Sequence, residues 1–282
     1  MLTLGRHRLA FDRPRVMGVL NVTPDSFSDG GRFLDRDAAL EHARRMLADG
    51  ADILDIGGES TRPGAAPTGE ADEIARVIPL VEALRAECDA RGVPLCIDTR
   101  KPAVMRAAIA AGATLVNDVA ALAAPGALET VAASGAAVCL MHMRGEPATM
   151  QKSPHYDDVV AEVKDFLAGR ATACERAGIA ADRIVLDPGF GFGKTNEHNF
   201  ELLARLEELA EIGRPLLVGI SRKGMLKHAT GRSVGDRLVG SVAAALIAVE
   251  RGARIVRVHD VAATRDALAV WQTMREQMKG QA

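Results

Sequence analysis

The residues that could do chemistry in this chain stand at the ends of eight apolar runs. In chain order they are Asn21, Asp55, Asp98, Asn117, Met141, Asp187, Lys223, and Arg257 with His259. Carboxylates and amides dominate the middle of this series, and cations gather at its end. A carboxylate can accept two N–H groups from an aminopyrimidine edge, much as it does from a guanidinium. Buried polar groups without partners cost roughly 2 kcal/mol or more, so we expect a heterocyclic ligand to supply the partners.

The cationic end of the series predicts a site for an anion such as phosphate. Arg257 offers a planar fork of donors, His259 adds a donor and Lys223 adds a compact charge. Asn21 would come close to them once the sheet closes, and its neutral oxygen suits Mg²⁺, which keeps water and phosphate oxygens as most of its ligands. We therefore expect Asn21 to be the metal ligand.

Each of these interpretations has a purely structural alternative. Asp98 and Asp187 could cap helices or pair with arginine, and the cations could be surface groups at helix starts. Arg257 argues against the second alternative, because an arginine inside the apolar run 255–258 is costly unless it faces a partner.

Two glycine-rich segments follow the second and sixth apolar runs. Residues 57–64 are Gly-Gly-Glu-Ser-Thr-Arg-Pro-Gly, and residues 187–194 are Asp-Pro-Gly-Phe-Gly-Phe-Gly-Lys. Glycine permits backbone angles that other residues avoid, so the second segment could approach a flat ligand, with Phe190 or Phe192 as an apolar wall. Arg62 of the first segment could reach a substrate anion. A tight turn packed under a helix is the alternative for 187–194.

The elements that must position these residues alternate along the chain. Strands are expected at 16–22, 52–57, 95–98, 114–119, 137–141, 184–187, 216–220 and 255–258. Helices are expected at 37–49, 70–91, 102–111, 124–134, 157–177, 197–211, 234–251 and 262–278. A strand followed by a helix eight times predicts a (β/α)₈ TIM barrel, an α/β fold whose active site lies at the C-terminal ends of the strands. We expect a single domain over residues 1–282, with its core at about 15–279.

Composition narrows the class of protein. The 282 residues are 48% hydrophobic and 26% charged, which suits a globular chain with a large core. The 35 basic and 37 acidic side chains form no long basic stripe, which argues against a nucleic-acid partner. The four cysteines show no metal or redox spacing, no apolar stretch is long enough to span a membrane and no signal peptide is evident. We expect a cytoplasmic protein without a membrane partner. No GxSxG elbow supports nucleophilic catalysis.

The motifs taken together resemble one family. These are NVTPDSFSDGG at 21–31, GESTRPG at 58–64, IDT at 97–99, NDV at 117–119, DPGFGFGK at 187–194, SRK at 221–223 and RVHDV at 257–261. In this order and over nearly the whole chain, they are similar to the motifs of dihydropteroate synthase, a pterin-binding family.

This resemblance implies a transferase of folate biosynthesis that is usually a homodimer assisted by Mg²⁺. The family joins 6-hydroxymethyl-7,8-dihydropterin pyrophosphate to p-aminobenzoate, which gives 7,8-dihydropteroate and pyrophosphate. By matching position, the substrate-binding residues would be Thr61, Arg62, Pro63, Asp98, Asn117, Met141, Asp187, Phe192, Gly219, Lys223, Arg257 and His259. Of these, Asp98, Asn117, Asp187 and Lys223 would hold the pterin, and Thr61, Arg257 and His259, with Asn21, the pyrophosphate and its metal.

The catalytic set implied by the resemblance is Asn21, Arg62, Lys223, Arg257 and His259. Phe27 and Asp29 would join Arg62 and Pro63 from two mobile loops that build the aminobenzoate site, which Phe192 and Lys223 would flank. Gly224 departs from the family, which often has serine there to bind the aminobenzoate carboxylate, although the backbone N–H of Gly224 could still serve.

Two alternatives share the barrel. A pterin-binding methyltransferase that moves a methyl group from a reduced folate to a corrinoid protein has no use for a pyrophosphate site. A non-enzymatic paralogue would be expected to lose loop residues such as Arg62 or anion ligands such as His259, and this chain has both.

Overall fold

Eight parallel strands close into a barrel in the order β10-β3-β4-β5-β6-β7-β8-β9. The structure is a computed structural model that describes residues 1–22, 32–60, 67–146 and 149–279. The barrel strands are β3 (Arg15–Asn21), β4 (Ile53–Gly57), β5 (Leu95–Asp98), β6 (Leu115–Asp118), β7 (Ala137–Met141), β8 (Ile184–Asp187), β9 (Leu216–Val218) and β10 (Ala253–Val258). The predicted (β/α)₈ barrel is confirmed, and each strand lies within about two residues of its expected position.

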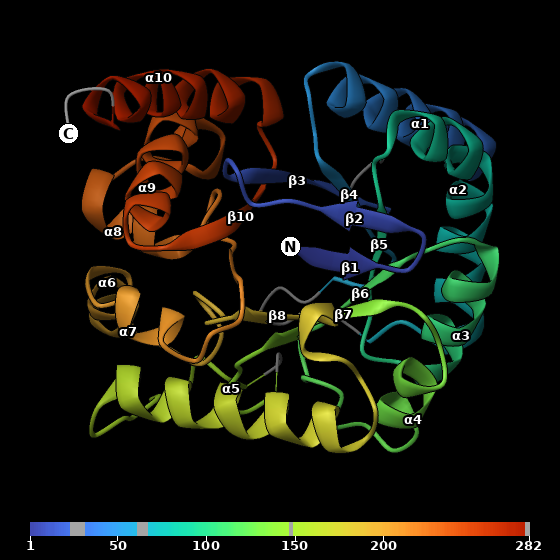
Figure 1. Ribbon diagram of the computed structural model, residues 1–282, viewed down its shortest axis with the longest axis horizontal. Coiled ribbons are helices and arrows are strands. Elements are labelled where there is room, and N and C mark those ends of the chain that lie inside the picture. The colour runs from blue at the N-terminus through green and yellow to red at the C-terminus, as the bar shows by residue number, and fades with distance from the viewer. Residues whose placement is uncertain (23–31, 61–66, 147–148, 280–282) are drawn as a thin grey trace.

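A ring of helices surrounds the barrel (Figure 1). They are α1 (Arg32–Ala48), α2 (Glu70–Arg91), α3 (Pro102–Ala111), α4 (Ala127–Ala132), α5 (Val159–Arg176), α6 (Asn196–Ala204), α7 (Glu207–Ala210), α8 (Gly224–Thr230), α9 (Leu238–Glu250) and α10 (Val261–Lys279). Short 3₁₀ turns cover Ala181–Arg183 and Val234–Asp236. No helix within the described ranges is long and apolar enough to cross a membrane.

The barrel interior has two layers of different character. The lower layer, near the strand starts, is an apolar cluster that includes Met17, Ile53, Leu115, Leu217 and Ile255. Side chains two residues further along a strand point to the same face. The upper inward-facing layer is therefore polar, and its members are Asp55, Asp98, Asn117, Asp187 and Arg257. The alternation of strand residues thus places an apolar plug beneath a charged layer.

A small hairpin that the sequence did not predict closes the lower end of the barrel. Strands β1 (Leu2–Leu4) and β2 (His7–Leu9) pair antiparallel. They lie across the middle of the helix ring in Figure 1. Leu2, Leu4 and Leu9 are buried in the same cluster as the lower layer. The hairpin therefore completes the apolar plug from below.

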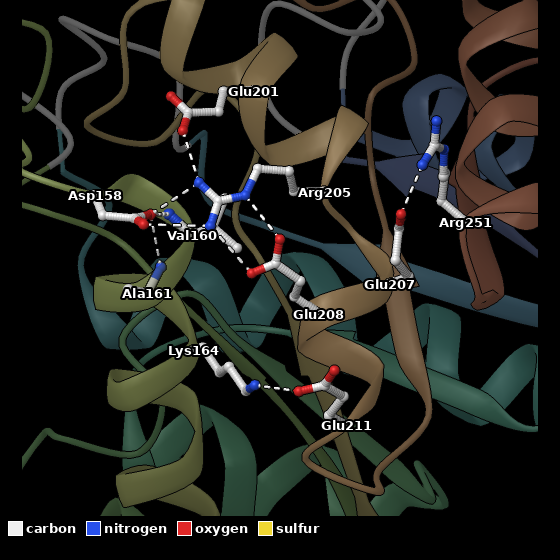
Figure 2. Close-up of polar contacts among 10 residues, drawn as sticks. All are labelled: Asp158, Val160, Ala161, Lys164, Glu201, Arg205, Glu207, Glu208, Glu211 and Arg251. Atoms are coloured by element: carbon white, nitrogen blue, oxygen red, sulfur yellow. Dashed lines mark hydrogen bonds and ion pairs between the residues drawn. The ribbon is translucent and has the colours of Figure 1, made fainter.

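The single helix expected at 197–211 is wrong, because α6 and α7 are separate helices. The break falls at Arg205, whose backbone leaves helical geometry at φ −111° and ψ 23°. The Arg205 guanidinium bonds to Glu201, to Glu208 and to Asp158 at the start of α5 (Figure 2). A tertiary contact with α5 thus accompanies a break that the local apolar pattern does not show. Helix α8 was also not among the predicted helices.

Candidate active site

Arg257 lies between two carboxylates in the upper layer. Its Nε donates to Asp55 Oδ2 at 2.6 Å and its Nη2 to Asp98 Oδ2 at 2.8 Å. Asp55 is fully buried, and Asn117 Nδ2 donates to the same Asp55 oxygen at 3.4 Å. Four residues from strands β4, β5, β6 and β10 therefore meet in one polar cluster. Asp98 therefore pairs with an arginine, as its structural alternative expected.

One guanidinium can neutralise only one of the two buried carboxylates. Burial raises the pKa of Asp98 to about 7, although the Arg257 guanidinium opposes the rise. Burial alone would lower the pKa of Arg257, but the carboxylates of Asp55 and Asp98 outweigh it and raise that pKa. Asp98 can therefore carry a proton near neutral pH, while Arg257 stays charged.

Asp187 and Lys223 form a second charged group beside the first. Asp187 stands in register with Met141 of β7, and its Oδ1 accepts from the Gly189 N–H at 2.7 Å. The Lys223 ammonium lies 4.3 Å from the centre of the Phe192 ring and donates to the Phe190 carbonyl. Burial lowers the pKa of Lys223 to about 8, and the charges of Asp187, Arg257 and Asp98 also act on it. The two groups therefore belong to one electrostatic site.

The segment 189–193 is held in a single shape by the residues around it. Gly189 and Gly193 have φ of +70° and +62°, and a Cβ on them would overlap the carbonyl oxygens of His142 and Arg144. The segment therefore packs directly on the backbone that follows β7, which only glycine allows. Phe190 is fully buried in the core, which leaves Phe192 as the aromatic wall.

The carbonyls of the same segment are bound to side chains. Gly191 and Gly193 accept from Gln151 Nε2 at 2.6 Å and from the Tyr156 hydroxyl at 2.8 Å. Asn199 Oδ1 accepts from the Gly191 N–H at 2.7 Å. The glycines therefore form a tight turn that is fixed by its neighbours, as the structural alternative for 187–194 expected, and the prediction of a flat ligand on it stays a prediction.

Asn21 stands at the end of β3, opposite Gly57 of β4. A Cβ on Gly57 would lie 3.4 Å from Asn21 Oδ1 and 3.7 Å from Asp98 Oδ2. The missing side chain therefore leaves the two oxygens facing a common space. Across the described ranges, no three His, Cys, Asp or Glu side chains gather as they would around a fully protein-bound metal. Only an ion that takes most of its ligands from water and substrate would suit this oxygen.

His259 follows β10 and is tied to the segment after β9. Its backbone N–H and its Nδ1 lie 3.3 and 3.0 Å from Ser221 Oγ. Gly219 of the neighbouring strand end lies next to Arg257: a Cβ added to it would be in ordinary van der Waals contact with Arg257 Cβ, at 3.7 Å. The ends of β9 and β10 thus hold His259 and Arg257 on the same side of the barrel.

The structure brings most of the predicted residues together. Asp98, Asn117 and Arg257 form the first group, Asp187, Lys223 and Phe192 form the second, and Asn21, Met141, Gly219 and His259 stand at neighbouring strand ends. The predicted loop residues Phe27, Asp29, Thr61, Arg62 and Pro63 lie outside the described residues.

Arg257 has partners that the sequence did not indicate. We expected it among the cations around an anion, and in the structure its guanidinium also bonds to the carboxylates of Asp55 and Asp98. The sequence analysis named Asp55 at a strand end but gave neither it nor Lys194 a role in the site. A role for Asp55 was predictable, because it follows Ile53 by two positions and shares its inward direction.

Known proteins resemble this chain in sequence and in structure. A family model described as pterin binding enzyme matches residues 17–259. The dihydropteroate synthase of Haemophilus influenzae is 50% identical over 259 residues, which are 92% of this chain and 93% of that protein.

Two solved structures share the fold and more than half of the sequence. The dihydropteroate synthase of Xanthomonas albilineans with 4-aminobenzoic acid has a TM-score of 0.89 and 55% identity, with 95% of each chain covered. The Burkholderia cenocepacia enzyme complexed with 7,8-dihydropteroate has a TM-score of 0.89 and 55% identity, with 99% of this chain and 98% of that chain covered.

Proposed function

This chain belongs to the dihydropteroate synthase family of pterin-binding enzymes, and we propose that the polar layer of its barrel is where that reaction takes place. The chain is a transferase of folate biosynthesis that joins 6-hydroxymethyl-7,8-dihydropterin pyrophosphate to p-aminobenzoate. The observation that carries the assignment of the site is the convergence of Asp55, Asp98 and Arg257 with Asp187 and Lys223.

The pterin binds to the carboxylate and amide groups of this layer. Asp98, Asn117 and Asp187 offer acceptors and an amide donor to a ring that carries both N–H groups and ring nitrogens. Burial raises the pKa of Asp187, although Lys223 and the Gly189 N–H oppose it. A ligand N–H that replaces water at this carboxylate favours its charged form, so pterin binding and ionisation support each other.

The pyrophosphate group binds on the β10 side of the barrel mouth. Arg257 and His259 supply donors there, and Asn21 Oδ1 would be the protein ligand of Mg²⁺. The ion, when bound, would neutralise charge on the leaving group. Thr61 completes this subsite from the segment after β4.

The reaction proceeds with cationic character at the pterin methylene carbon. The bond between this carbon and the pyrophosphate oxygen breaks with its electron pair on the oxygen, where Arg257 and His259 stabilise the charge. The electron-rich dihydropterin spreads the positive charge. The aniline nitrogen then forms the new C–N bond, and its proton passes to the departing pyrophosphate, without a strong general base.

The aminobenzoate binds last, against Phe192 and Lys223. Phe27, Asp29, Arg62 and Pro63 complete its site and exclude water, which would otherwise capture the cation. The ammonium of Lys223 attracts the aminobenzoate carboxylate, and the N–H of Gly224 adds a donor.

Two copies of the chain form a homodimer through α9 and α10, and each copy is a single domain. These neighbouring helices expose Val239 at 80%, Val270 at 73% and, one turn further along α10, Met274. Exposed apolar stripes of this kind are typical of interfaces. Sedimentation should show a dimer that Val270→Glu weakens, and a monomer at all concentrations would contradict this part of the proposal.

One assay tests the proposed reaction. The protein is mixed with pterin pyrophosphate, p-aminobenzoate and Mg²⁺, and dihydropteroate and pyrophosphate are measured. We expect equal amounts of both products, and aminobenzoate binding that requires bound pyrophosphate or pterin pyrophosphate. Absence of dihydropteroate, or full turnover by Arg257→Ala, would overturn the proposal.

A further inference from the structure

Lys194 is a buried lysine that the proposed mechanism does not use. Its side chain ends the glycine-rich segment after β8, and the residue is only 2% exposed. The three N–H groups of the ammonium share four acceptors, among them the carbonyls of Gly189 at 2.9 Å, Phe192 at 3.2 Å and His142 at 3.4 Å. It also lies 2.9 Å from His142 Nδ1. A lysine is almost never buried to this extent without such partners.

The partners of Lys194 come from two neighbouring strand ends. Gly189 and Phe192 belong to the segment after β8, whereas His142 follows β7. Burial and the nearby charge of Lys194 lower the pKa of His142 to about 3, so its imidazole is neutral and Nδ1 can accept the hydrogen bond. The ammonium therefore joins the two segments at one buried point.

The bonds to Lys194 also fix which way the segment faces. Two of its carbonyls point inward to the ammonium, and a third, that of Phe190, accepts from Lys223. The Gly189 N–H meanwhile donates to Asp187 Oδ1. With these groups fixed, the carboxylate of Asp187 and the ring of Phe192 have little freedom to move.

We propose that Lys194 is a positioning residue that holds Asp187 and Phe192 in the geometry that binds the pterin. It acts through the carbonyls of Gly189, Phe192 and His142 and does not touch the substrate. This inference rests on the proposed function, since it assigns the pterin to the Asp187 side of the layer. The pyrophosphate subsite lies on the β10 side, so loss of Lys194 leaves it intact.

Lys194→Met tests the inference, because it keeps the length of the side chain and removes the donors. We expect the dissociation constant for 6-hydroxymethylpterin to rise at least about tenfold, the loss usual for hydrogen bonds to a charged group. Binding of pyrophosphate with Mg²⁺ should stay within about twofold of the parent by calorimetry. Amide exchange at Gly191 and Phe192 should speed up while α9 stays unchanged. Lys164→Met, at a half-buried lysine of α5 paired with Glu211, is the matched control and should change none of these.

Several outcomes separate this inference from the proposed function. Unchanged pterin binding in folded Lys194→Met would overturn it, as would equal weakening of pterin and pyrophosphate, which indicates general damage. If Lys194→Met does not fold, His142→Phe keeps a ring and removes one acceptor, and the pterin dissociation constant should rise about threefold or more. No rise in that variant would overturn the inference. An inactive parent that still binds pterin in this Lys194-dependent way would contradict the proposed function alone.

Discussion

Removal of the Arg257 guanidinium should destabilise the protein in a pH-dependent way. Arg257→Met keeps the aliphatic volume but leaves the carboxylates of Asp55 and Asp98 buried without their cation. Removal of one partner from a buried ion pair typically lowers the free energy of unfolding by about 3–5 kcal/mol. We expect a loss in this range at about pH 8, above the pKa of Asp98 in the parent.

The pH dependence follows from Asp98. Its carboxyl binds a proton up to about pH 7 in the folded chain, against an ordinary value of 3.8, so the folded state loses stability as the pH rises between these values. Above about pH 7 this loss levels off in the parent. In Arg257→Met no guanidinium opposes burial, so the pKa of Asp98 rises further and the loss continues. Each additional pH unit costs about 1.4 kcal/mol. The parent levels off near pH 7, so the difference in unfolding free energy between parent and variant should be larger at about pH 8 than at pH 6 by roughly the cost of one unit.

Urea unfolding followed by circular dichroism at the two pH values measures this difference. Arg251→Met is the control, because its partner Glu207 is an exposed carboxylate 2.6 Å away (Figure 2). An exposed pair contributes at most about 1 kcal/mol, and its loss should not depend on pH in this range. A loss for Arg257→Met that matches the control at both pH values would refute the interpretation of Arg257 as the counter-ion of two buried carboxylates.

Three further predictions concern Lys223, Gly189 and Asp118. The kcat/KM for pterin pyrophosphate should fall as the pH rises through about 8, because burial lowers the pKa of Lys223 to about 8 and the charged ammonium is lost above it. A profile that stays flat to about pH 9.5 would contradict this. Gly189→Ala should lower the melting temperature and weaken pterin binding, because its Cβ would overlap the His142 carbonyl. Gly178 has a comparable φ of +94° but open space around it, so Gly178→Ala should show only a backbone cost of about 1–2 kcal/mol. Equal losses for the two glycine variants would show that the close approach is unimportant. Asp118→Ala should destabilise the chain by about 1–3 kcal/mol in urea unfolding, because its buried carboxylate accepts the Ala120 and Leu122 N–H groups, and an unchanged midpoint would exclude this role.

The barrel strands could be predicted because both of their faces are buried. Leu95–Ile97 and Ala137–Met141 are apolar throughout, and a polar residue, Asp98 or His142, follows each run, so sequence and structure agree on the limits of these strands. The β1–β2 hairpin could not be predicted in this way. Each of its strands has only three residues, and its leucines are buried only because they pack against the lower end of the barrel.

The candidate site was predictable in its residues but not in its pairings. The positions of Asp98, Asp187 and Lys223 at the C-terminal ends of strands could be predicted from the apolar runs that precede them. The bond between Arg257 and Asp55 joins residues 202 positions apart, and nothing local in the sequence selects Asp55 over other carboxylates. Lys194 was passed over for a similar reason, since its burial depends on how the segment after β7 lies over the glycines.

The hairpin at the far end of the barrel bears on how the protein can be shortened or fused to another. The first nine residues lie outside the strand–helix pattern of the sequence, yet Leu2, Leu4 and Leu9 complete the core. Deletion of these residues would expose the lower leucine and isoleucine layer to water, and the trimmed chain should aggregate before its catalytic end is affected. An affinity tag or reporter placed ahead of the hairpin would instead emerge on the side away from the substrates, where it should leave turnover untouched.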